Sequence, residues 1–343
     1  MKEEWRSRPQ PGQSRQPDVE AAAEQNPAWN IEIFDPPLPA PANHWPKPFA
    51  EAYLTGPIPT RFKAENITRL VMLLTRLPED QAAALVEFGA AWLDDRPCLN
   101  ADQSLSAYHS FRLNPPAYGP VKFYEADPVR IVYEDRDLLV YNKESGRPSQ
   151  AVPHDAHNNV LTALGRLLAA RGDSPRLWLS HRLDADTSGL LLMAKNKEAA
   201  GAMGKAFQEG RVAKVYLCLG LGPRPADTEF IVNAPIAKEG RHYVVKPGGP
   251  GLESRTDFRV LNCEKGRLWH RILFQASPRT GRTHQIRLHL AWAGWPIAGD
   301  RFYGRPDEGE PACRLMLTSA RLAFRHPVSG EPISISHPAW QFE

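Results

Sequence analysis

Polar side chains that can do acid–base or metal chemistry gather in one short segment, SHRLDADTSGLLLMAKN. His181, Arg182, Asp184, Asp186 and Thr187 lie together directly before a run of apolar residues. Such a run predicts a buried strand, which would fix the backbone and leave the polar loop able to meet a ligand. Two carboxylates two residues apart fit a general acid and base, or half of a metal site. A turn stabilised by its own Asp, Thr and Ser side chains is the alternative interpretation.

The positive charge of the chain is concentrated beyond residue 125. Residues 1–125 hold 12 Lys and Arg against 16 Asp and Glu, whereas residues 126–343 hold 30 against 23. Arginine outnumbers lysine in the second stretch, and its planar guanidinium suits phosphate and base-edge recognition. The net charge of the whole chain is only +3, so a surface for a polyanion and an ordinary solvated surface both fit this distribution.

The elements that would hold these residues indicate an α+β fold. Short apolar or alternating runs predict strands, and apolar residues three and four apart predict helices. The predicted strands are residues 129–134, 137–143, 177–180, 189–195, 214–221, 267–276 and 321–327. The predicted helices are residues 160–171, 197–210 and 283–294. Because strands and helices do not alternate regularly, we expect a mixed, largely antiparallel central sheet with flanking helices.

The first 118 residues divide into two stretches of different composition. Residues 1–60 contain 12 of the 33 prolines, and proline fixes φ and removes a donor, so we expect a partly disordered tail and extended linker. Residues 61–118 carry two short helical patterns, a turn and a few strands, which predicts a small α/β module near the lower size limit for independent folding. We expect residues 119–343 to form the larger domain.

Cysteine spacing and hydropathy bear on metal binding and on location. The four cysteines, Cys98, Cys218, Cys263 and Cys313, are far apart and form no CxxC pair, which argues against a zinc ribbon and a disulfide framework. The chain has no run of about 18 uncharged apolar residues and no apolar stretch near its start. We therefore expect a cytoplasmic protein with no metal and no membrane partner.

The polar segment also resembles, nearly letter for letter, the HRLDxxTSGLLL signature of the RluA-type pseudouridine synthases, which isomerise uridines in RNA. Further segments follow in that family's order: VYEDRDLLVYNK (132–143), KVYLCLG (214–220), RTGRTHQIRLHLA (279–291) and PIAGDRFYG (296–304). LMLTSARLAFRHPVSGE (315–331) resembles the family's closing strand. The resemblance covers roughly residues 121–343 and implies the pseudouridine synthase fold with its catalytic cleft.

The resemblance implies roles for individual residues. Asp184 matches the essential carboxylate, Arg287 matches its ion-pair partner, and Tyr216 matches the active-site tyrosine, whose ring can stack on uracil and whose hydroxyl can move a proton. Arg182 matches the arginine that fills the gap left by the flipped nucleotide, since a stacked uridine has to leave the helix to react. The other candidates for contacting substrate or shaping the loops around it are His181, Thr187, Arg282 and His284.

The chemistry implied by the family sets what else the chain needs. Isomerisation breaks the N1–C1′ bond of uridine, rotates the uracil and joins C5 to C1′, without a redox change or an external group. The resemblance therefore implies no cofactor and no metal. It implies RNA as the partner, either rRNA or tRNA, acted on by a chain that we expect to be a monomer.

Two other functions remain as alternatives. An RNA-binding or ribosome-assembly factor with little turnover is disfavoured because Asp184, Tyr216 and Arg287 are all present. A hydrolase using Asp184 and Asp186 is disfavoured because carboxylates two residues apart in one turn are hard to place ~5 Å or more apart across a scissile bond.

Two segments depart from the family pattern. The usual Lys-Pro-x-Gly reads Lys143-Glu144-Ser145-Gly146 and is followed by an unusual loop, GRPSQAVPHDAHNN, which we expect at the rim of the active site, where it would affect substrate fit. Residues 61–118 only weakly resemble the small two-helix RNA-binding module that often precedes this domain. Their acidic balance leaves open that the module packs on the catalytic domain instead of touching RNA.

Overall fold

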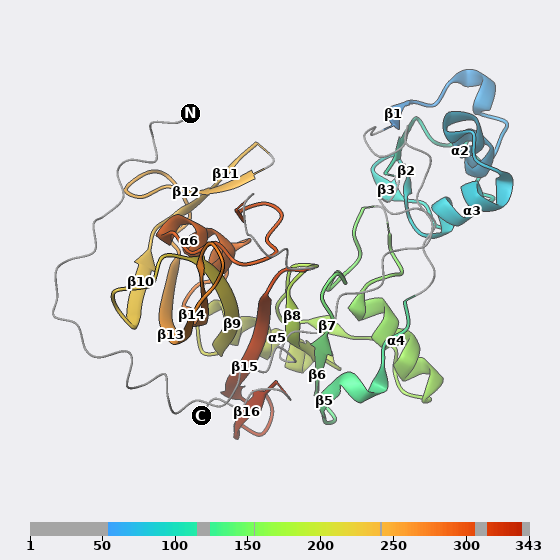
Figure 1. Ribbon diagram of the computed structural model, residues 1–343. Helices are drawn as coiled ribbons and strands as arrows, with labels where there is room; N and C mark the ends of the chain where they lie inside the picture. Colours follow the sequence, from blue (N-terminus) through green and yellow to red (C-terminus); the bar gives the residue numbers. More distant parts are fainter. Residues whose placement is uncertain (1–53, 115–123, 154, 241, 306–313, 338–343) are drawn as a thin grey trace. The chain divides into compact units, whose positions relative to one another are not determined.

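The computed structural model describes residues 54–114, 124–153, 155–240, 242–305 and 314–337. Most of the expected tail and linker, residues 1–53, lies outside the described residues, as does Cys313. The chain divides into two compact units (Figure 1). Described residues of the first unit belong to Val212–Phe324, and those of the second belong to Pro36–Arg211 and Arg325–His337. Within the described residues, no helix is both long enough and apolar enough to cross a membrane.

The first unit is an antiparallel sheet with one helix packed on it (Figure 1). Its strands run in the order β10-β13-β14-β9-β15. Their bounds are Glu229–Asn233 for β10, Arg255–Lys265 for β13, His270–Pro278 for β14, Ala213–Gly222 for β9 and Leu317–Arg325 for β15. Helix α6 (Gln285–Ala293) packs against β13 and β14 and against a separate hairpin formed by β11 (Ile236–Glu239) and β12 (His242–Val245).

Strand β9 ends at Gly222, where the segment that contains Gly294 and Trp295 passes close to its backbone. A Cβ on Gly222 would lie 2.7 Å from the Gly294 carbonyl oxygen and 2.6 Å from the Trp295 ring, so only glycine allows this approach. The crossing chain then follows β9, with the Leu221 amide donating to the Pro296 carbonyl at 2.9 Å and the Ala298 amide donating to Leu219 at 2.9 Å. This pairing fixes where the GDRFYG segment begins.

Two strands of the main sheet of the second unit, β6 (Leu138–Lys143) and β8 (Ser188–Ala194), are buried on both faces. Strand β6 pairs antiparallel with β5 (Ile131–Glu134) and with β8, and β7 (Trp178–Leu179) also pairs with β8. Every residue of β6 and β8 is buried. Helices α4 (Val160–Ala170) and α5 (Lys197–Gln208) begin at asparagine caps, the expected residue type for satisfying the first amides of a helix. β16 (Pro332–Ser336) is a further strand of this unit.

A smaller sheet in the same unit has its own core. Its order is β1-β4-β2-β3, with bounds Leu54–Pro57, Ser110–Leu113, Ala91–Leu93 and Arg96–Pro97, and it is accompanied by α2 (Ile67–Thr75) and α3 (Glu79–Glu87). Leu70, Leu85 and Leu113 are among its buried side chains. The β2–β3 turn places both Asp94 and Asp95 at positive φ, 44° and 61°. Amides of His109 and Ser110 bind the Asp94 carboxylate, and these bonds, led by the one from Ser110, lower the pKa of Asp94 to about 2.

The architecture confirms the predicted α+β class with a largely antiparallel sheet, since each pairing given above is antiparallel. Several predicted bounds were wrong at their ends. The helix predicted over residues 283–294 begins two residues later, because His284 adopts a left-handed conformation with φ of 56°. The strand predicted over residues 267–276 begins at His270 and continues to Pro278.

Candidate active site

The loop between β7 and β8 carries four of the predicted site residues. Asp184 is half-buried, Arg182 is exposed, and Thr187 is buried with only 3% of its surface accessible. The Thr187 amide donates to the Asp184 carbonyl at 3.1 Å, which closes a turn around the carboxylate. His181 points back onto the core, where its Nε2 accepts a bond from the Leu192 amide at 3.0 Å and its ring stacks on Phe207.

The loop that follows β6, which we call the clamp loop, forms hydrogen bonds to the backbone on both sides of Asp184. The Ser149 hydroxyl accepts from the Leu183 amide at 3.1 Å and donates to the Leu183 carbonyl at 2.8 Å. The Ser145 hydroxyl donates to the Asp186 carbonyl at 2.7 Å, and the Gly146 amide donates to Ala185 at 2.9 Å. Ser145 and Gly146 fit the Lys-Pro-x-Gly pattern, whereas Ser149 lies in the unusual loop that follows it. The loop that departs from the family pattern therefore still fixes the backbone beside Asp184.

Lys143 is a site residue that sequence reasoning did not single out. It is fully buried at the end of β6. Its ammonium donates to the carbonyls of Glu144, Arg147 and Ala185 at 2.8, 2.7 and 2.8 Å. A buried charge is tolerated when its donors are bonded, so Lys143 ties both loops to the sheet. The available signal was its position as a charged residue ending an apolar strand.

In the first unit, Arg287 forms a fork with a carboxylate that sequence reasoning did not name. Its Nε and Nη2 donate to Oδ2 and Oδ1 of Asp300, both at 2.7 Å, and the two side chains are 3% and 0% exposed. Burial alone would raise the pKa of Asp300, but the bonds and charge of Arg287, together with the amides of Phe302 and Tyr303, hold that pKa below its usual value. Asp300 lies in the PIAGDRFYG segment, which was the available signal.

Aromatic rings surround the Arg287 guanidinium. Its carbon lies 5.5 Å from the centroid of the Phe302 ring and 5.3 Å from that of Tyr303. The Tyr303 hydroxyl is 2.9 Å from Nδ1 of His284, and Phe302 stacks on the His284 ring. Arg287 is thereby held in one orientation by a carboxylate and by the rings beside it.

The other predicted residues of the first unit lie on β9 and on the loop that enters α6. Tyr216 is 8% exposed and faces Ala276 and Ser319 on the neighbouring strands. Arg282 donates from Nε to the Glu253 carbonyl at 3.0 Å and from its amide to Oε1 of Gln285 at 3.0 Å. The loop therefore has a fixed backbone.

A buried polar network sets the entry to α6. Gln285 accepts from the Thr280 hydroxyl at 2.7 Å and donates to the Arg255 carbonyl and the Thr256 hydroxyl, both at 3.0 Å. Thr256 in turn lies 2.9 Å from Nδ1 of His289, whose Nε2 lies 3.1 Å from the Ala234 carbonyl. Because a carbonyl can only accept, Nε2 of His289 carries the proton. Burial lowers the pKa of His289 to about 4.

A group of possible metal ligands, Asp135, Asp137 and His326, is found in the second unit. Nδ1 of His326 accepts from the amides of Val328 and Ser329, so Nε2 is the donor toward Asp135 at 3.1 Å. Asp135 also accepts from the amides of Asp137 and Leu138, both at 2.7 Å. Because Nε2 carries a proton and the Asp135 carboxylate is occupied, this group is arranged as a hydrogen-bonded turn.

The predicted site residues thus fall into two local groups. His181, Arg182, Asp184 and Thr187 share one loop of the second unit, and Tyr216, Arg282, His284 and Arg287 lie around β9 and α6 in the first. Sequence reasoning missed Lys143, Ser149 and Asp300, which hold the backbone or another side chain.

Comparisons with known proteins agree on one family. Residues 137–292 match the family described as RNA pseudouridylate synthase. A ribosomal large subunit pseudouridine synthase C from Vibrio vulnificus is 37% identical over 213 residues, which cover 61% of this chain and 65% of the relative. A ribosomal large subunit pseudouridine synthase D from Nitrosomonas europaea is 36% identical over 218 residues, covering 60% of this chain and 61% of the relative. The chain thus spans less than two thirds of the length of these relatives.

A solved structure is similar as well. The human RNA pseudouridylate synthase domain containing 1 protein aligns with a TM-score of 0.51 at 29% sequence identity, covering 63% of this chain and 86% of that one.

Proposed function

We propose, from the premise that the chain belongs to the RNA pseudouridylate synthase family, that it isomerises uridines in RNA to pseudouridine. The membership rests on the match over residues 137–292 and on relatives that are 37% identical. Nothing is added to or removed from the nucleotide overall, because the proton lost from C5 is balanced by one gained at N1.

The loop around Asp184 is the observation that carries the proposal. A half-buried carboxylate lies in a turn whose backbone is bonded on either side by Ser149 and Ser145. Chemistry on a glycosidic bond requires a carboxylate whose position is fixed to within roughly 0.5 Å of the productive geometry, and such fixing needs supporting groups. The clamps supply that support.

The neighbouring residues take complementary roles. Arg182 is exposed two residues before Asp184, and the role that we propose for it is to occupy the stack that a flipped uridine leaves, recovering part of the cost of flipping. Tyr216 stacks on the uracil and exchanges a proton with it. For Arg287, whose Nε and Nη2 donate to Asp300, the role that we propose is to keep the Asp184 carboxylate ionised. A guanidinium is suited to this role because it stays charged when desolvated. This scheme uses no cofactor and no metal.

The substrate we propose is a structured RNA, ribosomal in the first instance, because the relatives are named for the large ribosomal subunit. Transfer RNA is the second choice. The chain would then act in the cytoplasm, as a monomer. Mapping pseudouridines across ribosomal and transfer RNA in cells with and without the protein identifies the target.

Exchange of Asp184 tests the proposal directly. We expect Asp184→Asn and Asp184→Ala to abolish tritium release from RNA that carries 5-tritiated uridine, with RNA affinity kept within about tenfold, because the carboxylate acts on the reacting bond and adds little to backbone recognition. Asp186→Asn is the matched control in the same turn and should retain turnover. Release at near wild-type rate from Asp184→Ala would contradict the assignment.

A further inference from the structure

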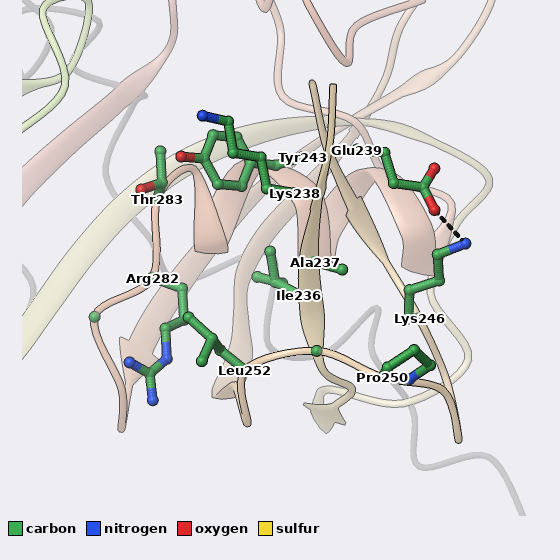
Figure 2. A pocket seen from close by; sticks show the side chains of 12 residues that line it. Ile236, Ala237, Lys238, Glu239, Tyr243, Lys246, Pro250, Leu252, Arg282 and Thr283 are labelled. Carbon is green, nitrogen blue, oxygen red and sulfur yellow. Dashed lines mark ion pairs between the residues drawn. The ribbon is translucent and has the colours of Figure 1, made fainter. Parts of the chain in front are cut away.

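A hollow of about 770 Å³ lies in the first unit beside the β11–β12 hairpin (Figure 2). The hairpin, the segment Pro250 to Leu252 and the loop Gly281 to Thr283 line it. The Leu252 amide donates to the Ile236 carbonyl at 2.8 Å and the Ile236 amide donates back at 3.0 Å. A Cβ on Gly251 would lie 3.1 Å from the Ile236 carbonyl group. One wall of the hollow is therefore formed by the backbone of Gly251 and Leu252, which pairs with Ile236 on β11.

The lining residues of the hairpin fall on its two faces, and the faces differ in charge. Lys238 is directly opposite Tyr243 in the register, so both side chains lie on the same face. Figure 2 shows them on the side of Arg282 and Thr283, with Glu239 and Lys246 on the other side. Glu239 and Lys246 form an ion pair at 2.5 Å. Lys246 therefore neutralises the charge of Glu239, the acidic residue of the lining, on the face away from Lys238.

The face with Lys238 and Tyr243 presents cations next to exposed apolar surface. In the described part of the chain, neither Lys238 nor Arg282 forms an ion pair with an acid. Leu252 is 61% exposed. The Tyr243 ring lies 5.8 Å from the His284 ring, and His284 stacks on Phe302, which is 65% exposed.

Such a combination favours a nucleotide over a bare anion. Cations that track the backbone, interleaved with aromatic and apolar surfaces for the bases, are the pattern of single-strand binding. The volume falls within the usual range for pockets that take organic ligands, roughly 300 to 1,000 Å³, whereas a phosphate ion alone would leave most of it empty. Lys238 and Arg282 suit phosphate oxygens, and Tyr243 and Leu252 offer the surface for a base.

We propose that this face of the hairpin binds a single-stranded nucleotide of the RNA substrate next to the uridine that is isomerised. The loop from Gly281 to Thr283 leads through His284 directly into α6, which carries Arg287 in its first turn. RNA held on the hairpin would therefore enter the part of the unit where the predicted catalytic arginine lies. The inference rests on the proposed function for the identity of the strand, and it adds Lys238 and Tyr243 as binding residues.

The test compares two lysines of one hairpin. The probe is a short fluorescein-labelled oligouridylate, titrated with the full chain over a range of salt concentrations. Each lost phosphate contact lowers the slope of log K against log salt by ~0.7 for single strands, so Lys238→Ala should reduce the slope by that amount and weaken binding. Lys246→Ala, on the other face and already paired with Glu239, should leave slope and affinity at wild-type values. Equal slopes for the two variants would overturn the proposal.

Stacking is tested separately. Tyr243→Ala should weaken binding of the oligouridylate by ~5- to 150-fold, the range for loss of one base stack, whereas Tyr243→Phe should bind like wild type. Thermal unfolding of each variant establishes that the hairpin is intact, and equal affinity for Tyr243→Ala and Tyr243→Phe in folded protein would remove the base-stacking role. Tritium release by the wild-type chain is measured in parallel. If the wild-type chain releases tritium but Lys238→Ala binds the oligouridylate as tightly as wild type, only the hairpin site is refuted. If Lys238→Ala weakens binding but the wild-type chain releases no tritium, only the proposed isomerase activity is refuted.

Discussion

The Arg287–Asp300 fork is a buried ion pair, and its geometry gives a sharp expectation. Removal of one partner from a buried pair typically costs 3 to 5 kcal/mol, because the other charge is left unsatisfied. Lysine keeps the charge but cannot donate to both Asp300 oxygens at once. We therefore expect Arg287→Lys to lower the free energy of unfolding by roughly 2 to 4 kcal/mol and turnover by more than tenfold, measured by urea titration and by tritium release.

An exposed ion pair provides the control for this prediction. Arg259 and Glu229 form a pair at 3.6 Å whose side chains are 62% and 71% exposed, and exposed pairs contribute about 1 kcal/mol or less. Arg259→Lys should change neither stability nor turnover measurably. If Arg287→Lys kept more than half of the wild-type turnover, the bidentate geometry would not matter for the reaction.

His289 predicts a pH dependence of stability. Its pKa is about 4 in the folded chain because it is buried, against 6.5 for the exposed side chain. As the pH falls, the His289 imidazole is therefore protonated in the unfolded chain before it is protonated in the folded chain. The contribution of neutral His289 to the free energy of unfolding is complete above about pH 6.5 and is lost toward pH 4. The loss amounts to on the order of 2 to 4 kcal/mol for this group.

Urea titrations between pH 7.5 and pH 4 would check the dependence, with wild type compared with His289→Gln. The variant should be less stable at neutral pH, because the bonds to Thr256 and Ala234 change, but it should show a flatter dependence on pH. His242→Gln is the exposed control. Parallel curves for wild type and His289→Gln would contradict the assignment of this pH dependence to His289.

Site residues could be recognised from the sequence where they belong to a motif that acts on substrate. Asp184 and Arg287 stand in such segments, and their roles remain predictions until exchanged. The position of Lys143 at the end of an apolar strand was a signal, but its bond to Ala185 and the bonds of Ser149 to Leu183 join backbone groups far apart in the sequence. Because every residue has a backbone carbonyl, the residue type at Ala185 or Leu183 does not indicate that its backbone takes part in such a bond.

Elements were predictable where burial is uniform. β6 and β8 are buried at every position, and their unbroken apolar runs predicted them. β10, β11, β12 and β16 were missed because each is four or five residues long and has at most one buried residue. β13 was missed for a similar reason, since its charged residues interrupt the apolar positions over 11 residues.

At the scale of an element, the clamp loop should control the rate more than the binding. Ser149→Ala leaves the amide and carbonyl of Leu183 without the hydroxyl that bonds both, and an unsatisfied buried group costs ~1 to 3 kcal/mol. A loosened Asp184 is expected to lower kcat severalfold or more with little change in KM, because a positioning contact matters at the transition state. Ser149 is a positioning residue on this view.

The matched control is Ser174→Ala, because Ser174 is exposed and lies outside the clamp. Single-turnover tritium release separates the chemical step from binding. A rise in KM with kcat unchanged would mean that Ser149 contributes to RNA binding. Rescue by Ser149→Thr, which keeps the hydroxyl, would support the positioning role.

On the scale of the whole molecule, the clamp loop links the small N-terminal sheet to the Asp184 loop. Beyond Ser149, the Pro153 carbonyl accepts from Nε1 of Trp92 at 2.8 Å and from Nδ2 of Asn114 at 3.4 Å. The Ala156 amide donates to the Phe88 carbonyl at 2.6 Å. These bonds lie within one compact unit, and they favour the interpretation that the acidic module supports the catalytic loop.

A deletion and a point variant test that interpretation. A chain that begins near Pro120 should lose turnover in single-turnover assays, with a smaller change in KM, because the bonds to Pro153 and Ala156 are removed. Trp92→Phe, which removes only the Nε1 donor, should show the same effect in milder form. A chain that begins at Leu54 should be as active as the full chain, since all the matched motifs lie beyond residue 121. A raised KM with unchanged turnover in both module variants would instead identify the module as an RNA-binding unit.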